Sequence, residues 1–122
     1  MAREYGPESV ENFIDAGPSS AVAEKGKLVV TVGAHSVALV RIAGRVYGVD
    51  NRCPHRDGEL GFGDLDGFHL FCPLHAWVFD VRDGRGFFPK GAEVACFEVK
   101  EEGGRLLVAT RGVKPSQTGN WP

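Results

Sequence analysis

The 122-residue sequence has no long apolar run, no even set of cysteines and no strong excess of one charge. No segment approaches the roughly 20 apolar residues of a membrane-spanning helix, and the first residues contain no apolar stretch of a signal peptide. We therefore expect a cytoplasmic protein with no membrane partner. Three cysteines cannot all pair within one chain, and disulfides are rare in the cytoplasm. A formal net charge of −2 argues against a nucleic-acid partner.

The sequence is rich in glycine, and from residue 21 onward short β-prone runs alternate with turn residues. Asp83-Gly84 and Gly103-Gly104 are typical hairpin turns, because both pairs adopt positive φ at little cost. This spacing predicts an all-β fold, an antiparallel sandwich or barrel, in a single domain over residues 1–122. The predicted strands are Ala21–Lys25, Lys27–Val32, Ser36–Ile42, Arg45–Asp50, His69–Cys72, Trp77–Val81, Val94–Lys100 and Arg105–Thr110.

The two ends of the chain depart from this pattern. Val10, Phe13 and Ile14 have the spacing of one helix face, which predicts a short helix over residues 8–16. Residues 112–122 are predicted to form a flexible tail.

Residues 51–68 interrupt the strand pattern with glycines and acidic residues. A long loop without secondary structure is uncommon inside a compact domain, and it indicates either a functional segment or a wrong strand assignment. The acidic residues fit a solvated loop, and they also fit a negative rim that attracts a basic partner. The sequences on either side of the loop favour a functional role.

Cys53-Pro54-His55 opens this loop and Cys72-Pro73-Leu74-His75 follows it, with sixteen residues between His55 and Cys72. Two cysteines and two histidines in two short clusters can converge on one metal centre. The alternative, buried core cysteines and surface histidines, would require this pairing to arise by accident. Structural zinc sites usually take ligand pairs of one type, whereas each cluster here offers one thiolate and one imidazole.

This arrangement resembles the Rieske ferredoxin family, whose [2Fe–2S] cluster has two cysteines on one iron and two histidines on the other. The resemblance extends over residues 20–110 and implies that Cys53 and Cys72 bind the inner iron while His55 and His75 bind the outer iron. It also implies a base sheet over residues 20–50 and 92–110 with an inserted cluster-binding subdomain over residues 51–91.

The sequence differs from the Rieske proteins of cytochrome bc complexes at four positions. Those proteins carry a disulfide between the ligand loops, where this chain has Gly58 and Leu74. They also carry a serine and a tyrosine that donate hydrogen bonds to cluster sulfurs, where this chain has Trp77 and Phe79. Loss of these donors predicts a low reduction potential.

Phe88 and Pro89 fall where the family has a third loop over the cluster. A hydrophobic lid and a simple hairpin end fit these two residues about equally well. For Trp77, packing in the core is favoured over contact with a partner. Cys96 is expected to be a passive thiol.

The resemblance predicts a one-electron carrier, not an enzyme in its own right, that accepts electrons from a reductase and passes them to an oxygenase or another terminal enzyme. A small subunit of an NADH-dependent nitrite reductase shares the ligand pattern and is the main alternative. A structural zinc module is a remote alternative. An oxygenase component needs a second iron site, and only His35 and His69 remain for it.

Overall fold

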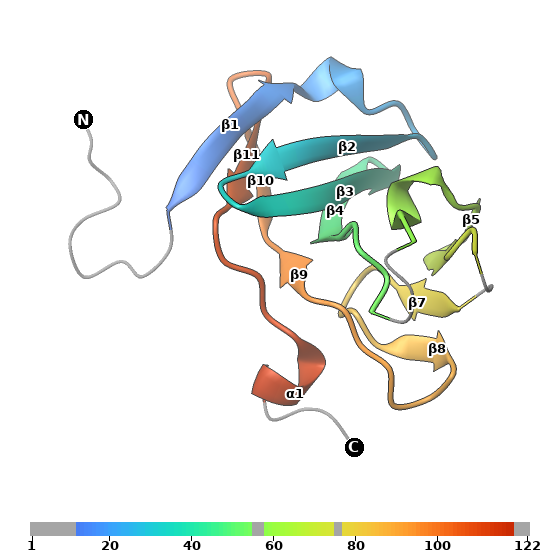
Figure 1. Cartoon of the computed structure of the whole chain (residues 1–122). Coiled ribbons are helices and arrows are strands. Elements are labelled where there is room, and N and C mark those ends of the chain that lie inside the picture. The colour runs from blue at the N-terminus through green and yellow to red at the C-terminus, as the bar shows by residue number, and fades with distance from the viewer. Residues whose placement is uncertain (1–11, 55–57, 75–76, 119–122) are drawn as a thin grey trace.

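A computed structural model describes residues 12–54, 58–74 and 77–118 (Figure 1). Within these residues three antiparallel sheets have the strand orders β1-β11-β10, β2-β3-β4-β9 and β5-β6-β7-β8, which confirms the all-β fold class. No helix in this part of the chain is long and apolar enough to cross a bilayer.

The elements are β1 Phe13–Pro18, η1 Ser19–Ala21, β2 Lys27–Val32, β3 His35–Ile42, β4 Arg45–Asp50, η2 Leu60–Phe62, β5 Leu65–Asp66, β6 His69–Phe71, β7 Val78–Asp80, β8 Gly86–Phe88, β9 Cys96–Phe97, β10 Val99–Glu102, β11 Arg105–Ala109 and α1 Pro115–Thr118.

Strand β3 is buried on both faces and separates two hydrophobic cores. Val37 and Leu39 point into the core that β3 shares with β11, and Ala38 and Val40 point into a second core. Because successive side chains of a strand alternate between its faces, one strand serves both cores. The second core includes residues of sheet β5–β8, so it connects this small sheet to the rest of the protein.

The predicted helix over residues 8–16 is wrong in its described half, because Phe13–Pro18 forms strand β1. Residues 8–11 lie outside the described residues. Phe13 pairs with Ala109 and Ile14 pairs with Val108 of β11. Hydrogen bonding to an existing strand outweighs the weak helical spacing of a segment this short.

Three further predictions need correction. Val94–Lys100 is not one strand, because β9 Cys96–Phe97 and β10 Val99–Glu102 belong to different sheets. Ala21–Lys25 is not a strand, because η1 ends at Ala21 and Glu24 makes only an isolated bridge to Arg41. Residues 112–118 of the predicted tail are held to the body of the protein. Val113 exchanges backbone hydrogen bonds of 2.9 Å with Cys96, and α1 follows it. Residues 119–122 lie outside the described part.

The long loop over residues 51–68 also contains structure that the sequence did not predict. It includes η2 and the short strand β5. Sheet β5–β8 follows and lies at one end of the molecule, beyond β4 (Figure 1). Both sequence clusters with cysteine and histidine therefore flank a short ordered segment instead of a structureless loop.

Candidate metal centre

The first cysteine cluster begins directly after β4, and Asn51 fixes its starting point. Asn51 is 2% exposed. Its side-chain Oδ1 accepts a hydrogen bond of 2.7 Å from the Gly61 N–H, and its backbone carbonyl accepts one of 2.7 Å from the Leu60 N–H. Its own N–H donates to the Ser36 carbonyl at 2.8 Å. Asn51 thus holds η2 against β3 and sets the direction in which the chain leaves the sheet.

The two cysteine loops are closed by equivalent backbone hydrogen bonds. The Cys53 N–H donates to the Gly58 carbonyl at 2.8 Å, and the Cys72 N–H donates to the Trp77 carbonyl at 2.7 Å. Each loop therefore begins at a cysteine and returns five residues later. By sequence His55 lies within the first loop and His75 within the second, but both histidines are outside the described residues.

Gly58 shows that the two loops are in direct contact. A Cβ atom placed on Gly58 would lie 2.6 Å from the Cys72 Sγ and 3.2 Å from the Leu74 side chain. No side chain larger than hydrogen fits there without movement of the sulfur. Gly58 and Leu74, which replace the loop-joining cysteines of the cytochrome bc proteins, are thus neighbours here.

Cys53 and Cys72 are 0% and 3% exposed and belong to the same hydrophobic core. Neither forms a disulfide. Two buried thiols, one in each of two loops that are in contact, suit a cation that binds thiolates and needs shielding from water. The donor set of two sulfurs here and one histidine in each loop fits a Rieske [2Fe–2S] cluster.

The four residues that the resemblance places around the cluster, Trp77, Phe79, Phe88 and Pro89, differ in how deeply they are buried. Phe79 is fully buried in the core that contains both cysteines, and Trp77 packs against that core with its ring 6.4 Å from the Phe79 ring. Phe88 is 60% exposed, and Pro89 follows it half-buried. A shielding role for these four residues stays a prediction.

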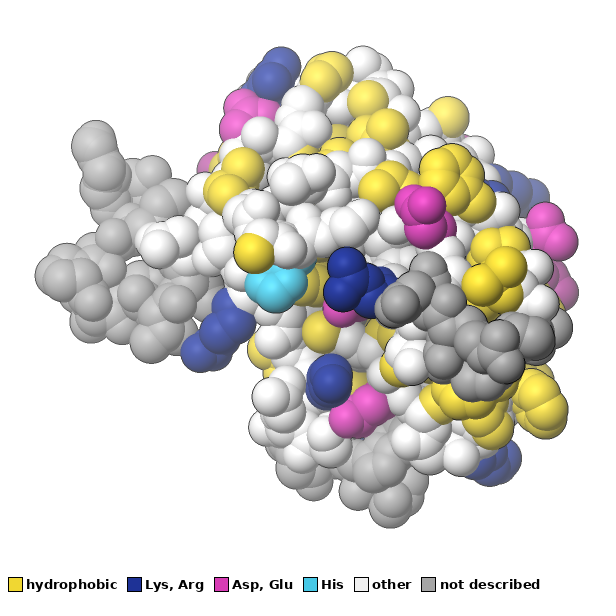
Figure 2. All heavy atoms as spheres, viewed as in Figure 1, with side chains coloured by type: hydrophobic (Ala, Val, Ile, Leu, Met, Phe, Trp, Pro, Cys, Tyr) yellow, Lys and Arg dark blue, Asp and Glu magenta, His cyan; other side chains and the backbone are white. Residues whose placement is uncertain are grey.

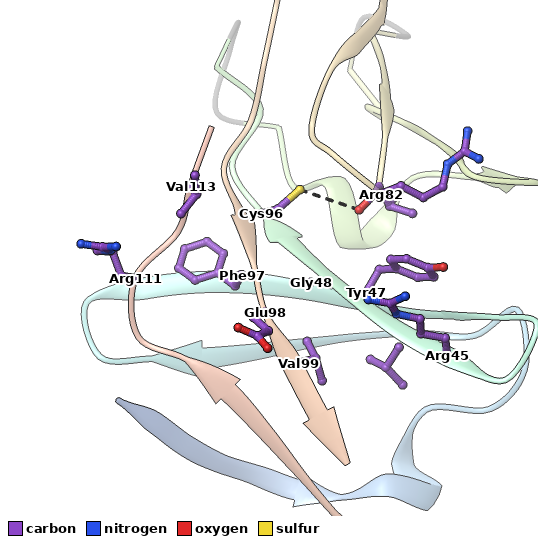
Figure 3. A pocket seen from close by; sticks show the side chains of 12 residues that line it. Arg45, Tyr47, Gly48, Arg82, Cys96, Phe97, Glu98, Val99, Arg111 and Val113 are labelled. Atoms are coloured by element: carbon purple, nitrogen blue, oxygen red, sulfur yellow. Dashed lines mark hydrogen bonds between the residues drawn. The ribbon is translucent and has the colours of Figure 1, made fainter. Parts of the chain in front are cut away.

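Cys96 lies outside this centre, in a cavity of about 300 Å³ between β4, β9 and the segment around Val81 (Figure 3). Its thiol donates a hydrogen bond of 3.7 Å to the Val81 carbonyl, drawn as the dashed line in Figure 3. Burial, reinforced by the nearby charges of Asp83 and Asp80, raises the pKa of Cys96 to about 12. The side chain is therefore a protonated thiol at neutral pH.

The two remaining histidines contact different aromatic rings, His35 in a tilted and His69 in a stacked arrangement. His35 lies 5.2 Å from the Phe97 ring, and His69 lies 4.4 Å from the Phe87 ring. Among the described residues no three or more histidine, cysteine or acidic side chains gather as a further metal site would require.

Sequence reasoning gave no role to the small and polar residues that shape this centre. The sequence signal at Asn51 is an asparagine directly after a strand, and the signal at Gly58 is a glycine three residues after the cluster Cys53-Pro54-His55. Gly63 has no such signal. A Cβ on it would collide with the Phe71 carbonyl, so η2 packs closely on the strand that leads to Cys72.

Two sequence comparisons show which known proteins this chain resembles. The Rieske [2Fe-2S] domain profile matches residues 12–98. The ferredoxin component of an alkene monooxygenase system from Xanthobacter autotrophicus is 42% identical over 84 residues, covering 67% of this chain and 68% of that protein.

Two solved structures have the same fold. The ferredoxin of carbazole 1,9a-dioxygenase from Nocardioides aromaticivorans superimposes with a TM-score of 0.77 at 26% identity, covering 82% of this chain and 99% of that one. A protein provisionally assigned as an NADH-dependent nitrite reductase small subunit from Mycobacterium tuberculosis has a TM-score of 0.77 at 20% identity, covering 85% and 99%, and shows the fold alone. The profile match spans more than half of the sequence, and the chain belongs to the Rieske [2Fe-2S] domain family.

Proposed function

We propose that this protein carries single electrons from a reductase to an oxygenase. The observation that carries the proposal is the contact at Gly58, which joins two loops with buried cysteines in a chain of the Rieske family. The relative from Xanthobacter and the solved ferredoxin from Nocardioides are both components of oxygenase systems, which supports an oxygenase as the acceptor.

We propose the ligands as Cys53 and Cys72 on the inner iron and His55 and His75 on the outer iron. The bound cluster supplies a one-electron change between its oxidised and reduced states. The burial of Cys53 and Cys72 supports their inner position, because a thiolate surrounded by core side chains is shielded from water. Two imidazoles in place of two thiolates make the oxidised centre neutral, so an added electron costs less than at an all-cysteine centre.

We propose that residues 51–91 form the cluster-binding unit and that residues 20–50 and 92–110 form its base. Strands β5–β8 make a separate sheet, which supports this division. The shared core around Phe79 and Val40 joins the unit to the base. A small sheet packed on a rigid base keeps both loops in place when the charge of the centre changes.

We propose no substrate-transforming step for the isolated chain. Once the four ligands are assigned, only His35 and His69 are left as histidine ligands, and their rings contact Phe97 and Phe87. The cytoplasmic location expected from the sequence stays a prediction.

Spectroscopy of the purified protein tests the ligand assignment. We expect red-brown protein with two irons per chain and a rhombic EPR signal after reduction with dithionite. His55→Ala and His75→Ala should abolish this signal, while the matched variants His35→Ala and His69→Ala should keep it. A normal Rieske spectrum in either ligand variant contradicts the assignment, and colourless protein with one zinc ion supports the structural zinc alternative.

The nitrite reductase alternative differs in assembly and not in spectrum. A shuttling carrier elutes as a small free protein on gel filtration of native cell extract. A subunit co-elutes with a large reductase, and that result would replace the carrier proposal.

A further inference from the structure

Residues 84–94 form a hairpin between the small sheet β5–β8 and strand β9. The Gly86 N–H donates to the Ala92 carbonyl at 2.7 Å, and the Val94 N–H donates to the Gly84 carbonyl at 2.9 Å. The first arm of the hairpin contains β8, which pairs with β7, so this arm is fixed to the small sheet. The second arm ends at Val94 and leads to β9. The hairpin therefore connects the proposed cluster-binding unit to its proposed base.

The start and end of this hairpin form part of the core that contains the two cysteines. Val94 is 3% exposed and shares this core with Cys53 and Cys72. Phe79, the strand partner of Gly86, belongs to the same core. Burial of this kind controls the access of water to a metal centre. A hairpin that moves away from the core would therefore expose both sulfurs.

The tip of the hairpin is open to solvent. Phe87 and Phe88 are each 60% exposed. Figure 2 shows hydrophobic side chains at the lower right of the molecule, where Figure 1 places β8. Apart from the contact of Phe87 with the His69 ring, these side chains keep most of their surface in water and contribute little burial energy. The position of the hairpin therefore depends mainly on the contacts of its two arms.

The C-terminal segment, residues 112–117, is an ordered extension of the base. Val113 exchanges two backbone hydrogen bonds of 2.9 Å with Cys96, and in Figure 1 this stretch runs beside β9. The Lys114 N–H donates to the Gln117 Oε1 at 2.7 Å, and the Gln117 N–H donates to the Lys114 carbonyl at 2.9 Å. These two bonds close the turn that begins α1, so the residue inside the turn has a fixed direction.

That residue is Ser116, and it binds the second arm of the hairpin. Its N–H donates to the Glu93 Oε1 at 3.0 Å, and its hydroxyl donates to the Glu93 Oε2 at 2.7 Å. Glu93 lies opposite Arg85 in the hairpin and directly before the buried Val94. Hydrogen bonds to an ionised carboxylate are stronger than those between neutral groups. We call this pair of bonds the Ser116–Glu93 latch.

We propose that the Ser116–Glu93 latch holds the hairpin against the metal centre, and that Ser116 is a positioning residue for retention of the cluster. The proposal rests on the proposed carrier function and its [2Fe–2S] centre. While the latch is closed, Val94 stays in the core and water is kept from the cysteine sulfurs. Without the latch the hairpin opens more often by local unfolding, and each opening exposes the cluster to water and to chelators.

Hydrogen exchange and cluster loss, measured on the same holoprotein samples, test the latch. Ser116→Ala removes the hydroxyl donor, so deuterium exchange in peptides that cover residues 84–94 should become about threefold faster or more. The loss of visible absorbance in the presence of EDTA should accelerate by a similar factor. Ser116→Thr keeps a hydroxyl and should restore both rates toward those of the wild type.

Lys114→Ala is the matched control in the same segment. The Lys114 side chain forms no hydrogen bond or ion pair with any residue that the structure describes. This variant should leave the exchange rate of the hairpin and the rate of cluster loss within about twofold of wild type. Equal effects of Lys114→Ala and Ser116→Ala, or no effect of Ser116→Ala, would overturn the latch.

A double-mutant cycle separates the latch from a general loss of stability. Glu93→Ala removes both acceptors and should accelerate exchange and cluster loss at least as much as Ser116→Ala. Adding Ser116→Ala to Glu93→Ala should have no further effect, whereas additive effects would show that the two residues act separately. Exchange in β3 should stay unchanged in every variant, and a parallel increase there would also overturn the proposal, because it indicates global unfolding. Wild-type protein that binds no iron would instead refute the proposed carrier function, while hydrogen exchange would still test the latch.

Discussion

At the scale of single residues, the proposed metal centre depends on a position with no side chain. The absent Cβ of Gly58 lets the first loop approach the Cys72 Sγ, because a carbon there would lie only 2.6 Å from the sulfur. Ordinary van der Waals contact requires roughly 3.5 Å or more. The contact between the loops is therefore a property of this one glycine.

Gly58→Ala should reduce the iron content of the purified protein, because the methyl group must displace the Cys72 sulfur. Gly67→Ala is the matched control. Gly67 has φ +61°, so alanine there costs about 1 kcal/mol of backbone strain, but no atom lies within 4 Å of the new methyl group. Iron and visible absorbance per chain measure the difference. A Gly58→Ala protein with two irons would show that the sulfur can move freely.

Cys96 should be unreactive in the folded protein. Burial raises its pKa from 9.0 to about 12, which lowers its thiolate fraction about a thousandfold relative to an unperturbed thiol. Iodoacetamide at pH 8 should label Cys96 only after denaturation, as peptide mass spectrometry would show. Rapid labelling of Cys96 in native holoprotein would contradict its burial.

The sequence indicates the candidate ligands more clearly than their surroundings. Cysteine and histidine at short spacing have few other uses, so the residue pattern alone is enough to single out Cys53 and Cys72. Asn51 and Gly58 act through hydrogen bonds and close contacts that form only when distant segments meet. A single sequence shows the residue type at such positions but not the neighbour that requires it.

At the scale of elements, Arg41 of β3 joins three segments that are far apart in the sequence. Its Nε donates to the Val22 carbonyl at 2.7 Å, and its Nη1 donates to the Gly44 carbonyl at 2.9 Å. Its Nη2 donates to the Ser19 carbonyl at 3.0 Å, and both terminal nitrogens contact the Glu101 carboxylate. One guanidinium thus links η1, the β3–β4 turn and β10.

Arg41→Lys should lower the free energy of unfolding by about 2 kcal/mol, because one ammonium group cannot reach all these acceptors. Denaturant unfolding measures the change. Lys27→Arg, on the neighbouring strand β2, is the control for replacing one basic side chain by another. It should change the free energy of unfolding by less than about 0.5 kcal/mol. Equal stability of Arg41→Lys and wild type would show that water replaces these bonds.

Glu101 adds a pH dependence to the same contact. The hydrogen bond from Arg41 lowers the pKa of Glu101 in the folded protein. The stabilisation from the ionised Glu101 carboxylate is therefore complete above its pKa in the unfolded chain, about 4.3. It is lost as the pH falls through the lower pKa of Glu101 in the folded protein. The stability difference between wild type and Glu101→Gln should stay constant from pH 7 to pH 5 and shrink below about pH 4. A difference that grows on acidification would reverse the assigned sign.

Strands were predictable where they alternate and where turns mark their ends. β2, β3 and β4 follow their predicted ranges closely, with Ala43 and Gly44 in the turn at positive φ of 53° and 82°. β1 was not predictable, because its conformation depends on pairing with β11, which lies about ninety residues later. Residues 112–118 were missed for the same reason, since they bind β9 and Glu93.

At the scale of the whole molecule, the two cores separated by β3 give the proposed cluster-binding unit a different environment from its proposed base. Cys53 and Cys72 share their core with buried aliphatic and aromatic side chains, among them Leu60, Leu70 and Phe79. Phe79 occupies the position where the cytochrome bc proteins place a hydrogen-bonding tyrosine, and it offers no hydroxyl. Exposed carboxylates at Asp64 and Asp66 further disfavour an added electron.

The reduction potential should therefore lie toward the low end of the Rieske range, near −150 mV. Phe79→Tyr should raise it by about 20–60 mV, the equivalent of one hydrogen bond of about 0.5–1.5 kcal/mol to a cluster sulfur. Phe97→Tyr places the same hydroxyl in the other core and should leave the potential unchanged. Redox titration followed by EPR measures all three proteins. A wild-type midpoint above about +100 mV would contradict the prediction, because a centre without these hydrogen-bond donors would then match the high-potential Rieske proteins.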